Sequence, residues 1–348
     1  MKALFLAGGI GTRLRPITED LPKPMVPIMG KPLLERNIEN LKKYNIINEI
    51  VLSTCYKPHK IENHFGDGKK FGVKISYISE DIPLGTGGAI KNAECFFDDT
   101  FLVFNADIIS DIDILDMIRF HHEKKALATI AVTQVDDPSA YGVIEHDKNG
   151  YITAFKEKPK PHETKSNLIN AGVYIFEREL LNEISSSKVV SIERETYPQL
   201  LEKGLKMATY HKCSYWLDLG TPDKYIKVHK DILKGKLEID GLNFNESIQF
   251  ISKTAKIHET ARLYGPVYIG ENVEIGAFSI IGPSTVLCDD SYVGTGAKVV
   301  GSVVWDRVSV GSGALVADSV LMSNCTVDRN SEEYNAVLTE NFSHPIAV

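Results

Sequence analysis

Cysteine and tryptophan are scarce in this chain, which has five cysteines and two tryptophans among its 348 residues. The cysteines are scattered and show no paired metal spacing: Cys55, Cys95, Cys213, Cys288 and Cys325. An odd, unpatterned set of thiols argues against a disulfide framework and is typical of the reducing cytoplasm. We therefore expect a cytoplasmic protein.

Long apolar runs and long basic runs are also missing. No apolar stretch approaches the ~20 residues that a membrane-spanning helix needs. The opening MKALFLAGGIG resembles a weak signal peptide, but its apolar run is short and ends in glycines. Because the net charge is -7, nucleic acid is a poor main partner. We expect neither a membrane nor a nucleic-acid partner.

The N-terminal two thirds of the chain alternate strand and helix patterns. Short, nearly continuous apolar runs at Leu4–Ala7, Ile50–Thr54 and Phe101–Phe104 are typical of strands buried on both faces of a parallel sheet. The length and the 43% hydrophobic content allow two domains.

A helix and a hairpin complete this pattern. In KPLLERNIENLKKY, Leu34, Ile38 and Leu41 share one helical face, and Pro32 suits the first turn. With the flanking strands this predicts a βαβ unit. In YGVIEHDKNGYITAFKEKP, two strand patterns flank the turn sequence Asp147–Gly150, which predicts a hairpin that interrupts the parallel order.

A six-residue repeat begins at Ile251. The phase slips by one near Val304 and resumes at Val310 and Val316. Before the slip an aliphatic residue recurs at Ile251, Ile257, Leu263, Ile269, Ile275, Ile281, Leu287, Val293 and Val299. Small or short side chains follow four residues after the first eight of these, from Ala255 to Ala297. Such repeats build a parallel β-helix, here of about four coils at ~18 residues per coil.

The predicted fold class is therefore α/β, with a Rossmann-like, mixed but mostly parallel sheet, followed by a parallel β-helix. We place the first domain at residues 1–235, a polar linker at 236–250, the β-helix at 251–330 and a C-terminal tail at 331–348. The β-helix buries its own coils, so we expect the first domain to fold without it. The faces and ends of the β-helix favour a homo-oligomer.

The stretch LFLAGGIGTRLRPITEDLPKPMVPI combines three glycines with cations directly after a strand. A dinucleotide fingerprint fails, because Leu14 occupies the third glycine position and the second strand ends without an acidic residue. A Walker loop fails as well, because no Gly-Lys-Ser/Thr follows. What remains is a glycine loop with Arg13 and Lys23, which fits a phosphate ligand. A plain surface turn would explain the glycines but not the whole set.

The same stretch resembles the signature of the sugar-nucleotide pyrophosphorylases, a nucleotidyltransferase family, and the resemblance covers nearly the whole chain. VFNADIISD, FKEKP, NLINAGVYIF, SIERETYPQL and YWLDLGTPDKY most resemble the mannose-1-phosphate guanylyltransferases, whose long form carries a C-terminal left-handed β-helix. PLGTGGAI at Pro83–Ile90 departs from the GTAG of many relatives. It resembles guanylyltransferases that act on heptose 1-phosphate.

The resemblance implies transfer of GMP from GTP to mannose 1-phosphate, which gives a nucleotide-sugar and pyrophosphate. The attacking phosphate is already ionised, so no general base is needed and catalysis rests on positioning and cations. Three alternatives stay open. They are thymidylyl, uridylyl or adenylyl transfer to glucose 1-phosphate, guanylyl transfer to heptose 1-phosphate, and a non-catalytic regulatory paralogue that binds nucleotide-sugar. His258 is a weak candidate for acyltransferase chemistry in the repeat.

The resemblance also implies site residues. Mg²⁺ is expected on Asp107 and Asp218, because carboxylates suit this hard cation, although a helix cap and a turn are the plain alternatives for the two. Arg13 and Lys23 are expected to act on the triphosphate. Apart from the resemblance, Glu80 precedes the glycine turn in YISEDIPLGTGGAI and could accept hydrogen bonds from guanine; a solvated carboxylate at a strand end is the plain alternative. The nucleotide-binding set is Leu6, Ala7, Gly8, Gly9, Gly11, Thr12, Arg13, Lys23, Glu80, Gly85, Thr86, Gly87 and Gly88. The sugar-phosphate set is Gly142, Glu157, Lys158, Asn170 and Gly172.

Overall fold

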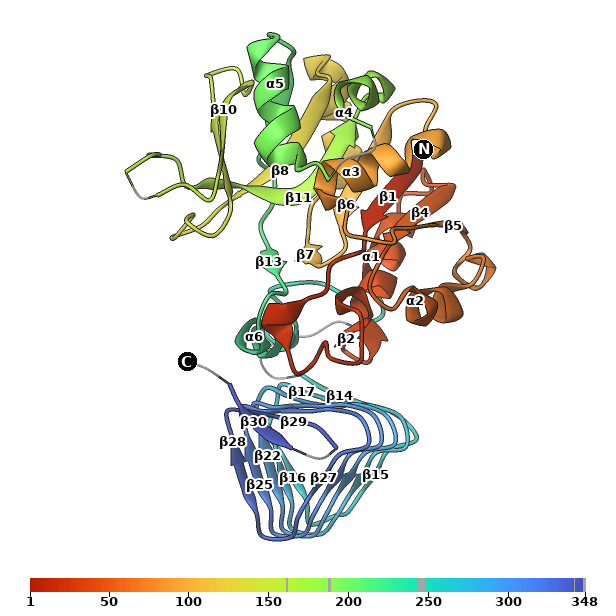
Figure 1. Cartoon of the computed structure of the whole chain (residues 1–348). Coiled ribbons are helices and arrows are strands. Elements are labelled where there is room, and N and C mark those ends of the chain that lie inside the picture. The colour runs from red at the N-terminus through yellow and green to blue at the C-terminus, as the bar shows by residue number, and fades with distance from the viewer. Residues whose placement is uncertain (161, 187–188, 243–247, 341, 347–348) are drawn as a thin grey trace. The chain divides into compact units, whose positions relative to one another are not determined.

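The structure is a computed structural model that describes residues 1–160, 162–186, 189–242, 248–340 and 342–346 (Figure 1). The residues pack into two compact units. Unit 1 is Met1–Ile10 with Asn37–Trp216, and unit 2 is Gly11–Arg36 with Leu217–Val348. These limits differ from the predicted domain boundaries, because residues 11–36 and 217–235 pack in one unit with the repeat region. The predicted linker and tail include residues 243–247, 341 and 347–348, which lie outside the described residues.

Unit 1 is built on a mixed sheet with the strand order β10-β9-β11-β6-β1-β4-β5, to which β8 and β12 are added beside β11. The three predicted buried strands are present and parallel as β1 (Lys2–Leu6), β4 (Glu49–Thr54) and β6 (Phe101–Asn105). The long strand β11 (Leu168–Phe176) joins β6 in antiparallel direction. The remaining strands of the sheet are β5 (Lys74–Ser79), β8 (Ala128–Gln134), β9 (Gly142–His146), β10 (Ile152–Glu157) and β12 (Met207–Tyr210).

The predicted hairpin is confirmed, since β9 and β10 pair antiparallel. Asp147 stabilises its turn, because one carboxylate oxygen accepts hydrogen bonds from the backbone N–H groups of Asn149 (2.8 Å) and Tyr151 (2.9 Å). The hairpin carries the FKEKP motif on β10, so it determines where the end of that strand, Glu157, is presented.

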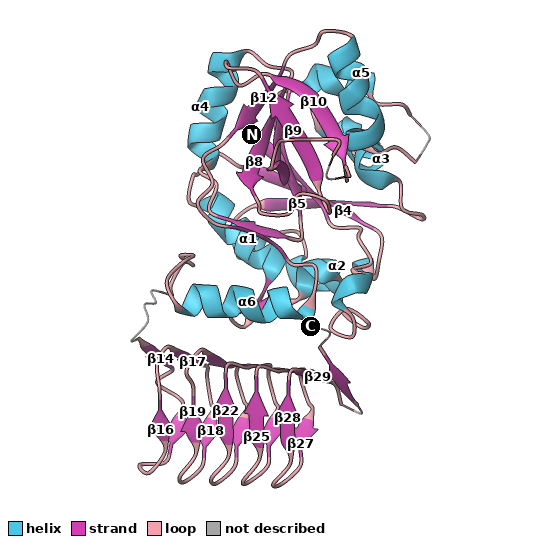
Figure 2. Ribbon diagram, turned by 90° about the vertical axis from the view of Figure 1, so that its left-hand side faces the viewer, coloured by secondary structure: helices cyan, strands magenta, loops and turns pink. Residues whose placement is uncertain are grey.

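Helices cover the two faces of this sheet (Figures 1 and 2). Leu4, Val51 and Val103 share a core with Ile90 of α3 and Leu200 of α5. The alternate residues Phe5 and Phe104 stack on the other face, with ring centroids 4.9 Å apart. The helices are α1 (Leu33–Lys42), α2 (Pro58–Phe65), α3 (Gly85–Asn92), α4 (Ile114–Lys124) and α5 (Tyr197–Glu202). The predicted helix is therefore confirmed as α1, which begins directly after Pro32.

The repeat region of unit 2 forms a parallel β-helix, in which each coil adds one strand to each of three sheets (Figure 2). In the described residues, five complete coils run from β14 to β28, and β29 begins another. The expected number of about four is therefore too low. The coils start before residue 251, at Gln249, and continue past residue 330 through Glu332–Tyr334 and Ala336–Leu338.

The strands of the β-helix are short and fall into three rows. The first row is β14 (Gln249–Ile251), β17 (Val267–Ile269), β20 (Thr285–Leu287), β23 (Val303–Val304), β26 (Val320–Leu321) and β29 (Ala336–Leu338), with β30 (Ser343–Pro345) antiparallel at its end. The second is β15 (Lys256–Ile257), β18 (Glu274–Ile275), β21 (Tyr292–Val293), β24 (Ser309–Val310) and β27 (Thr326–Val327). The third is β16 (Arg262–Leu263), β19 (Ile280–Ile281), β22 (Lys298–Val300), β25 (Leu315–Ala317) and β28 (Glu332–Tyr334).

The phase slip near Val304 marks a change in coil length. Val267 lies beside Thr285, eighteen residues later, whereas Val286 lies beside Val303, seventeen residues later. The later coils keep the shorter length, since Val303 lies beside Val320 and Val320 beside Val337. The slip therefore recurs once in every later coil, because each contains one step of five residues.

The outer face of the first strand row is buried. Its outward valines, Val286, Val303, Val320 and Val337, are at most 2% exposed. Within unit 2, Trp305 donates a hydrogen bond from Nε1 to the hydroxyl of Tyr225 (2.8 Å), which lies on α6 (Pro222–Leu233). Helix α6 therefore packs on the β-helix through a buried aromatic pair.

Residues 11–36 join the same unit through α6. The Tyr225 hydroxyl donates to the carbonyl of Pro27 (2.7 Å). His229 donates from Nδ1 to the Tyr225 carbonyl (2.9 Å) and accepts at Nε2 from the N–H of Met29 (3.2 Å). Pro27 and Met29 belong to a small hairpin of β2 (Pro27–Ile28) and β3 (Lys31–Pro32).

Across the described ranges, no helix combines the length and the apolar character that a bilayer crossing requires.

Candidate active site

Asp218 is the centre of a charged cluster in unit 2. It ends β13 (Trp216–Asp218) and is only 7% exposed. Lys23 Nζ lies 3.3 Å from Oδ1, Arg13 Nη2 lies 3.7 Å from Oδ2, and Lys224 Nζ lies 3.9 Å from Oδ2. Two of the cations come from the glycine-rich stretch and one from α6. The predicted Arg13, Lys23 and Asp218 are thus brought together, and Lys224 was not predicted.

Gly11 shapes the backbone that brings these cations together. Its φ of 70° is in the left-handed region, and it precedes a short 3-10 helix at Thr12–Leu14. Thr18 fixes the turn by donating from Oγ1 to the Gly11 carbonyl (2.7 Å). A side chain at Gly11 would be strained, and its Cβ would lie 3.2 Å from Lys23 Cβ. Glycine therefore allows the Arg13 and Lys23 segments to lie close together.

Unit 1 contains other predicted nucleotide residues, and several of them lie at the carboxyl ends of strands. Leu6 ends β1, and its carbonyl accepts from the N–H of Ala106 (3.2 Å), directly before Asp107. The N–H of Ala7 donates to Ser53 (2.8 Å) at the end of β4. Asp107 is half-buried in the turn between β6 and β7 (Ile108–Ser110). This is the edge at which open α/β sheets bind ligands.

Gly8 and Gly9 follow β1 in different surroundings. A Cβ on Gly8 would lie 3.2 Å from Cys55 Cβ and 3.8 Å from Glu80 Oε1, whereas a Cβ on Gly9 would meet nothing described within 4 Å. Gly8 thus serves close packing against the ends of neighbouring strands. The backbone at Gly9 has open space beside it, as a loop that binds a ligand needs.

Glu80 is buried and bonded within the protein. Its Oε1 accepts from the Ser53 hydroxyl (2.7 Å), and its Oε2 accepts from the N–H of Leu84 (2.8 Å). The side chain is 7% exposed and holds the loop that leads into α3. A carboxylate oxygen can accept a second hydrogen bond, so recognition of guanine by Glu80 stays a prediction.

The glycines of α3 pack against Val190. The N–H groups of Gly87 and Gly88 both donate to the Val190 carbonyl (2.9 and 3.2 Å). A Cβ on Gly85 would lie 2.6 Å from the same carbonyl oxygen, and Gly85 also has a φ of 74°. The N–H donors of Gly87 and Gly88 are thus used inside the protein, and the assignment of Gly85, Thr86, Gly87 and Gly88 to the nucleotide site stays a prediction.

The predicted sugar residues of the hairpin lie side by side in unit 1. A Cβ on Gly142 would lie 2.9 Å from Glu157 Oε2, so the missing side chain leaves that carboxylate room. Lys158 Nζ lies 3.9 Å from Glu157 Oε1, with 58% of the lysine side chain exposed. Lys158 has a φ of 49°, and its N–H donates to the Tyr141 carbonyl (3.0 Å). A cation and an acceptor are thus presented together.

Asn170 and Gly172 form a bulge in β11. Asn170 donates from Nδ2 to the Tyr174 hydroxyl (2.8 Å) and accepts at Oδ1 from the N–H of Gly172 (3.0 Å). The pairing of β11 with β8 shifts register between Asn170 and Tyr174. Gly172 has a φ of 73°, and a Cβ there would lie 2.9 Å from Asn105 Nδ2. Both residues therefore have structural roles beside the predicted contact with a sugar.

Glu193 was missed by the sequence analysis, although it lies in the quoted SIERETYPQL motif. Its Oε2 accepts from the hydroxyls of Thr86 (2.6 Å) and Ser191 (2.8 Å). Burial, followed by the charge of Glu193, raises the pKa of Glu157 above its ordinary value. Glu193 thus links a predicted nucleotide residue to a predicted sugar residue. It lies in a π-helical turn, Ile192–Thr196, which local sequence does not predict.

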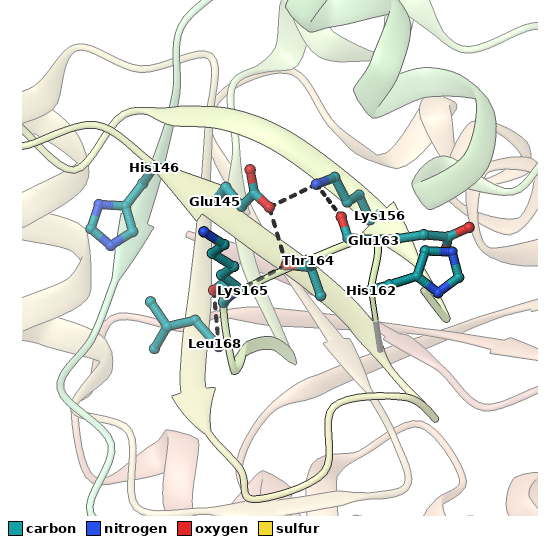
Figure 3. Close-up of a pocket in the computed structure, with 9 residues that line it drawn as sticks. Glu145, His146, Lys156, His162, Glu163, Thr164, Lys165 and Leu168 are labelled. Carbon is teal, nitrogen blue, oxygen red and sulfur yellow. Dashed lines mark hydrogen bonds and ion pairs between the residues drawn. The ribbon is translucent and has the colours of Figure 1, made fainter. Parts of the chain in front are cut away.

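A hollow of about 520 Å³ lies elsewhere on the hairpin (Figure 3). Lys156 donates there to Glu145 Oε1 and to the Glu163 carbonyl, both at 2.7 Å. None of the predicted site residues lines it. We therefore separate this hollow from the candidate active site.

The Nucleotidyl transferase family matches residues 2–235, and the GMPPB C-terminal domain matches residues 263–343. The chain belongs to the nucleotidyl transferase family. It is therefore a nucleotidyltransferase, with the described cluster of cations in the family's matched region. Enzymes of this family generally use a divalent metal ion.

Known relatives of this nucleotidyltransferase differ in substrate. A mannose-1-phosphate guanylyltransferase of Mycobacterium tuberculosis is 37% identical over 88% of this chain and 83% of its own length. A UTP–glucose-1-phosphate uridylyltransferase of Synechocystis is 34% identical over 88% of each. The solved structure of HddC from Yersinia pseudotuberculosis complexed with GMP-PN has a TM-score of 0.56 and 32% identity, and covers 65% of this chain and 96% of that one.

Proposed function

We propose that this nucleotidyltransferase transfers GMP from GTP to mannose 1-phosphate and releases pyrophosphate. The observation that carries the phosphate chemistry is the cluster of Arg13, Lys23 and Lys224 around Asp218. The choice of guanine and mannose rests on the Mycobacterium tuberculosis relative and on the GMP-PN complex of HddC. The coarser activity, nucleotidyl transfer to a sugar 1-phosphate, is common to both named relatives.

The reaction forms one bond and breaks one. An oxygen of the sugar phosphate attacks the α-phosphorus of the triphosphate, and the bond to the β-phosphate oxygen breaks, so that pyrophosphate leaves with its electron pair. The nucleophile is already an anion, so no residue needs to accept a proton. Charge builds up on the leaving group, and cations placed beforehand stabilise that charge.

Each charged group has a proposed part in this step. Arg13 and Lys23 neutralise the triphosphate and the leaving pyrophosphate. Lys158 holds the phosphate of the sugar, while Glu157 and Asn170 take hydroxyl groups of the ring. Lys158 Nζ lies 3.9 Å from Glu157 Oε1. This supports binding of the sugar phosphate beside the sugar ring at the end of β10.

Asp107 and Asp218 stay the proposed ligands of Mg²⁺. Carboxylate oxygens suit this ion. The cations around Asp218 would repel a bare divalent ion, so the donor set fits Mg²⁺ that arrives with phosphate oxygens. When bound, the ion would add positive charge where the phosphates need it.

A substrate grid tests the proposal. Pyrophosphate release is measured for GTP, ITP, dTTP and UTP, each with mannose 1-phosphate and glucose 1-phosphate. We expect the highest kcat/KM for GTP with mannose 1-phosphate. ITP lacks only the 2-amino group of guanine and should lose about tenfold or more, because an unpaired polar group in a closed site costs roughly 1–3 kcal/mol.

Other outcomes of the grid identify the alternatives. Highest activity with UTP or dTTP and glucose 1-phosphate would overturn the guanylyl assignment and keep the reaction class. No turnover with any pair, and none with ATP or heptose 1-phosphate in the same assay, would favour the non-catalytic paralogue. Acyl transfer by the β-helix has little support, because His258 is exposed and, among the described hydrogen bonds, its side chain bonds only to Thr260.

A further inference from the structure

Residues 190–193, here called the linking segment, are hydrogen-bonded to the start of α3 within unit 1. The N–H of Val190 donates to the Leu84 carbonyl (2.8 Å). The Thr86 hydroxyl donates to Glu193 Oε2 (2.6 Å) and accepts from a backbone N–H of the segment (3.0 Å). The single proton of this hydroxyl is therefore used inside the protein, which makes Thr86 a link between the two elements.

The start of α3 is connected in turn to the predicted nucleotide residues. The N–H of Leu84 donates to Glu80 Oε2 (2.8 Å), while a Cβ on Gly8 would lie 3.8 Å from Glu80 Oε1. A ligand that contacts the loop at Gly8 thus lies one side chain away from Leu84. Since the Leu84 carbonyl accepts from Val190, a restraint on Leu84 is also a restraint on the linking segment.

The linking segment also leads to the strand that carries predicted sugar residues. The π-helical turn that begins in the segment packs on β10, and the Phe155 ring of β10 lies 5.1 Å, between centroids, from the ring of Tyr197, which follows the turn. A Cβ on Gly142 would lie 2.6 Å from Phe155 Cζ, so this ring packs against the backbone at Gly142. The charge of Glu193 acts on Glu157 as well. A shift of the segment therefore changes the surroundings of both predicted sugar residues.

The end of this turn is not fully bonded. Among the described residues, the Tyr197 hydroxyl is buried and has no hydrogen-bond partner. A buried polar group without a partner is rare in proteins, and single π-helical turns occur often at functional sites. Both observations favour a second arrangement of the turn, toward which a ligand can shift it.

We infer that the linking segment couples the two substrate sites, so that a bound triphosphate strengthens the binding of the sugar 1-phosphate. The inference rests on the proposed function and concerns how its two substrates affect one another. A triphosphate that restrains Leu84 fixes the segment and β10 beforehand, so the sugar phosphate binds at a lower cost in conformational entropy. Such coupling is reciprocal, so the sugar phosphate strengthens triphosphate binding by the same factor. Thr86 and Glu193 act as positioning residues in this coupling.

The test measures the affinity for mannose 1-phosphate by titration calorimetry, with the wild type alone and with the wild type saturated with Mg²⁺ and α,β-methylene GTP. This analogue cannot transfer its nucleotide, because carbon replaces the oxygen between the α- and β-phosphorus atoms. We expect the Kd of mannose 1-phosphate to fall about fivefold or more when the analogue is bound, the lower range of coupling between sites. The reverse titration should give the same factor.

Three variants locate the coupling. Thr86→Val removes the hydroxyl that bonds to Glu193 and should reduce the factor to less than about twofold, whereas Thr86→Ser keeps the hydroxyl and should keep the factor. The matched control is Ser191→Ala, which removes the other hydroxyl bonded to the same oxygen of Glu193 and leaves the bond to Thr86 in place. It should keep the factor as well, because a merely structural change alters both affinities equally.

A wild type without coupling, or an unchanged factor in Thr86→Val, would overturn the inference. An equal loss of the factor in Ser191→Ala would do so too. Since the wild-type factor is measured without any substitution, the inference can fail even if a variant does not fold. If the substrate grid favours another pair, the same titration uses that sugar phosphate and the α,β-methylene analogue of that triphosphate. The guanylyl assignment then fails, while the coupling is still decided.

Discussion

Among single residues, Glu157 shows most directly how the fold changes the chemistry of a side chain. Burial is the main cause that raises its pKa, the neighbouring charge of Glu193 adds to it, and Lys158 and Arg194 act in the opposite direction. The fold therefore places this carboxylate in an environment that disfavours its charge. An anion at this position helps a site that accepts hydrogen bonds from sugar hydroxyls. The same buried charge lowers the stability of the folded protein.

Glu157→Gln should stabilise the protein at pH 8 and impair it as an enzyme. The folded-state pKa of Glu157 lies above its ordinary value of 4.5. Ionisation of Glu157 therefore lowers the free energy of unfolding as the pH rises from 4.5 through the folded-state pKa. The variant should have a higher thermal midpoint than the wild type at pH 8, a smaller difference near pH 4.5, and a raised KM for the sugar phosphate. An exposed control, Glu123→Gln, should change neither the thermal midpoint nor the KM for the sugar phosphate. A lower midpoint for Glu157→Gln at pH 8 would contradict the argument.

Asp107→Asn and Asp218→Asn should each reduce kcat about 100-fold or more, because each removes a charge proposed to hold the metal ion. The control is Asp223→Asn, an exposed carboxylate in the first turn of α6. Steady-state rates at saturating Mg²⁺ check this, and chelation by EDTA should stop the wild type. Near-normal kcat in either variant would remove that aspartate from the metal site.

At the scale of elements, one corner of the β-helix departs from the residues that its backbone favours. Phe278, Gly296, Gly313 and Asn330 occupy equivalent positions in successive coils, and all have φ between 58° and 71°. Glycine and asparagine tolerate this left-handed region, whereas a bulky aromatic residue is strained there. Phe278 is also 68% exposed, so little burial offsets the strain.

Phe278→Asn should therefore stabilise unit 2 by about 1 kcal/mol. Phe278→Ala is the matched control, because it removes the ring and keeps a residue that disfavours positive φ. In denaturant unfolding of the full chain, Phe278→Asn should have a higher free energy of unfolding than Phe278→Ala. If the two variants were equally stable, exposure of the ring and not the backbone would account for any gain.

The elements themselves could largely be predicted from sequence. The apolar runs of β1, β4 and β6, the apolar stripe of α1 and the Asp147–Gly150 turn are local patterns, and local patterns decide such elements. The recurring five-residue step was recognised only once, near Val304, because the sequence analysis followed the repeat only to Val316. The repeat continues at the buried residues Leu321 and Val327 before Glu333 interrupts it. The contact of Glu193 with Thr86 could not be predicted, since the two residues are distant in sequence. Lys224 lies only six residues after Asp218, but local sequence does not show that its side chain turns back toward that carboxylate.

For the whole molecule, the division into units is the main result that sequence could not give. The residues of the glycine-rich stretch after Ile10 and the residues after Trp216 belong to the same unit as the β-helix. The bond between Trp305 and Tyr225 and the ion pair between Lys230 and Asp318 connect α6 to the coils. That the first domain folds without the β-helix stays a prediction, against which the packing of α6 on the coils argues. A repeat that buries its own core gives no sign in the sequence of an outer apolar face.

A chain cut after residue 240 should therefore fold poorly. It would keep α6 but lose Trp305, and Tyr225, which is fully buried in the full chain, would become exposed. We expect a lower thermal midpoint and aggregation in size-exclusion chromatography. Trp305→Ala in the full chain should destabilise unit 2 by about 3–5 kcal/mol, and Trp305→Phe by less. A monodisperse, fully active fragment 1–240 would show that α6 does not need the coils.

The constant length of the later coils has a consequence for how such a chain evolves. Val286, Val303, Val320 and Val337 repeat at intervals of seventeen residues along one outer face. A gene segment that encodes seventeen residues can therefore be duplicated or deleted without shifting the register of the strands on either side. The length of the β-helix is thus free to change by whole coils between descendants.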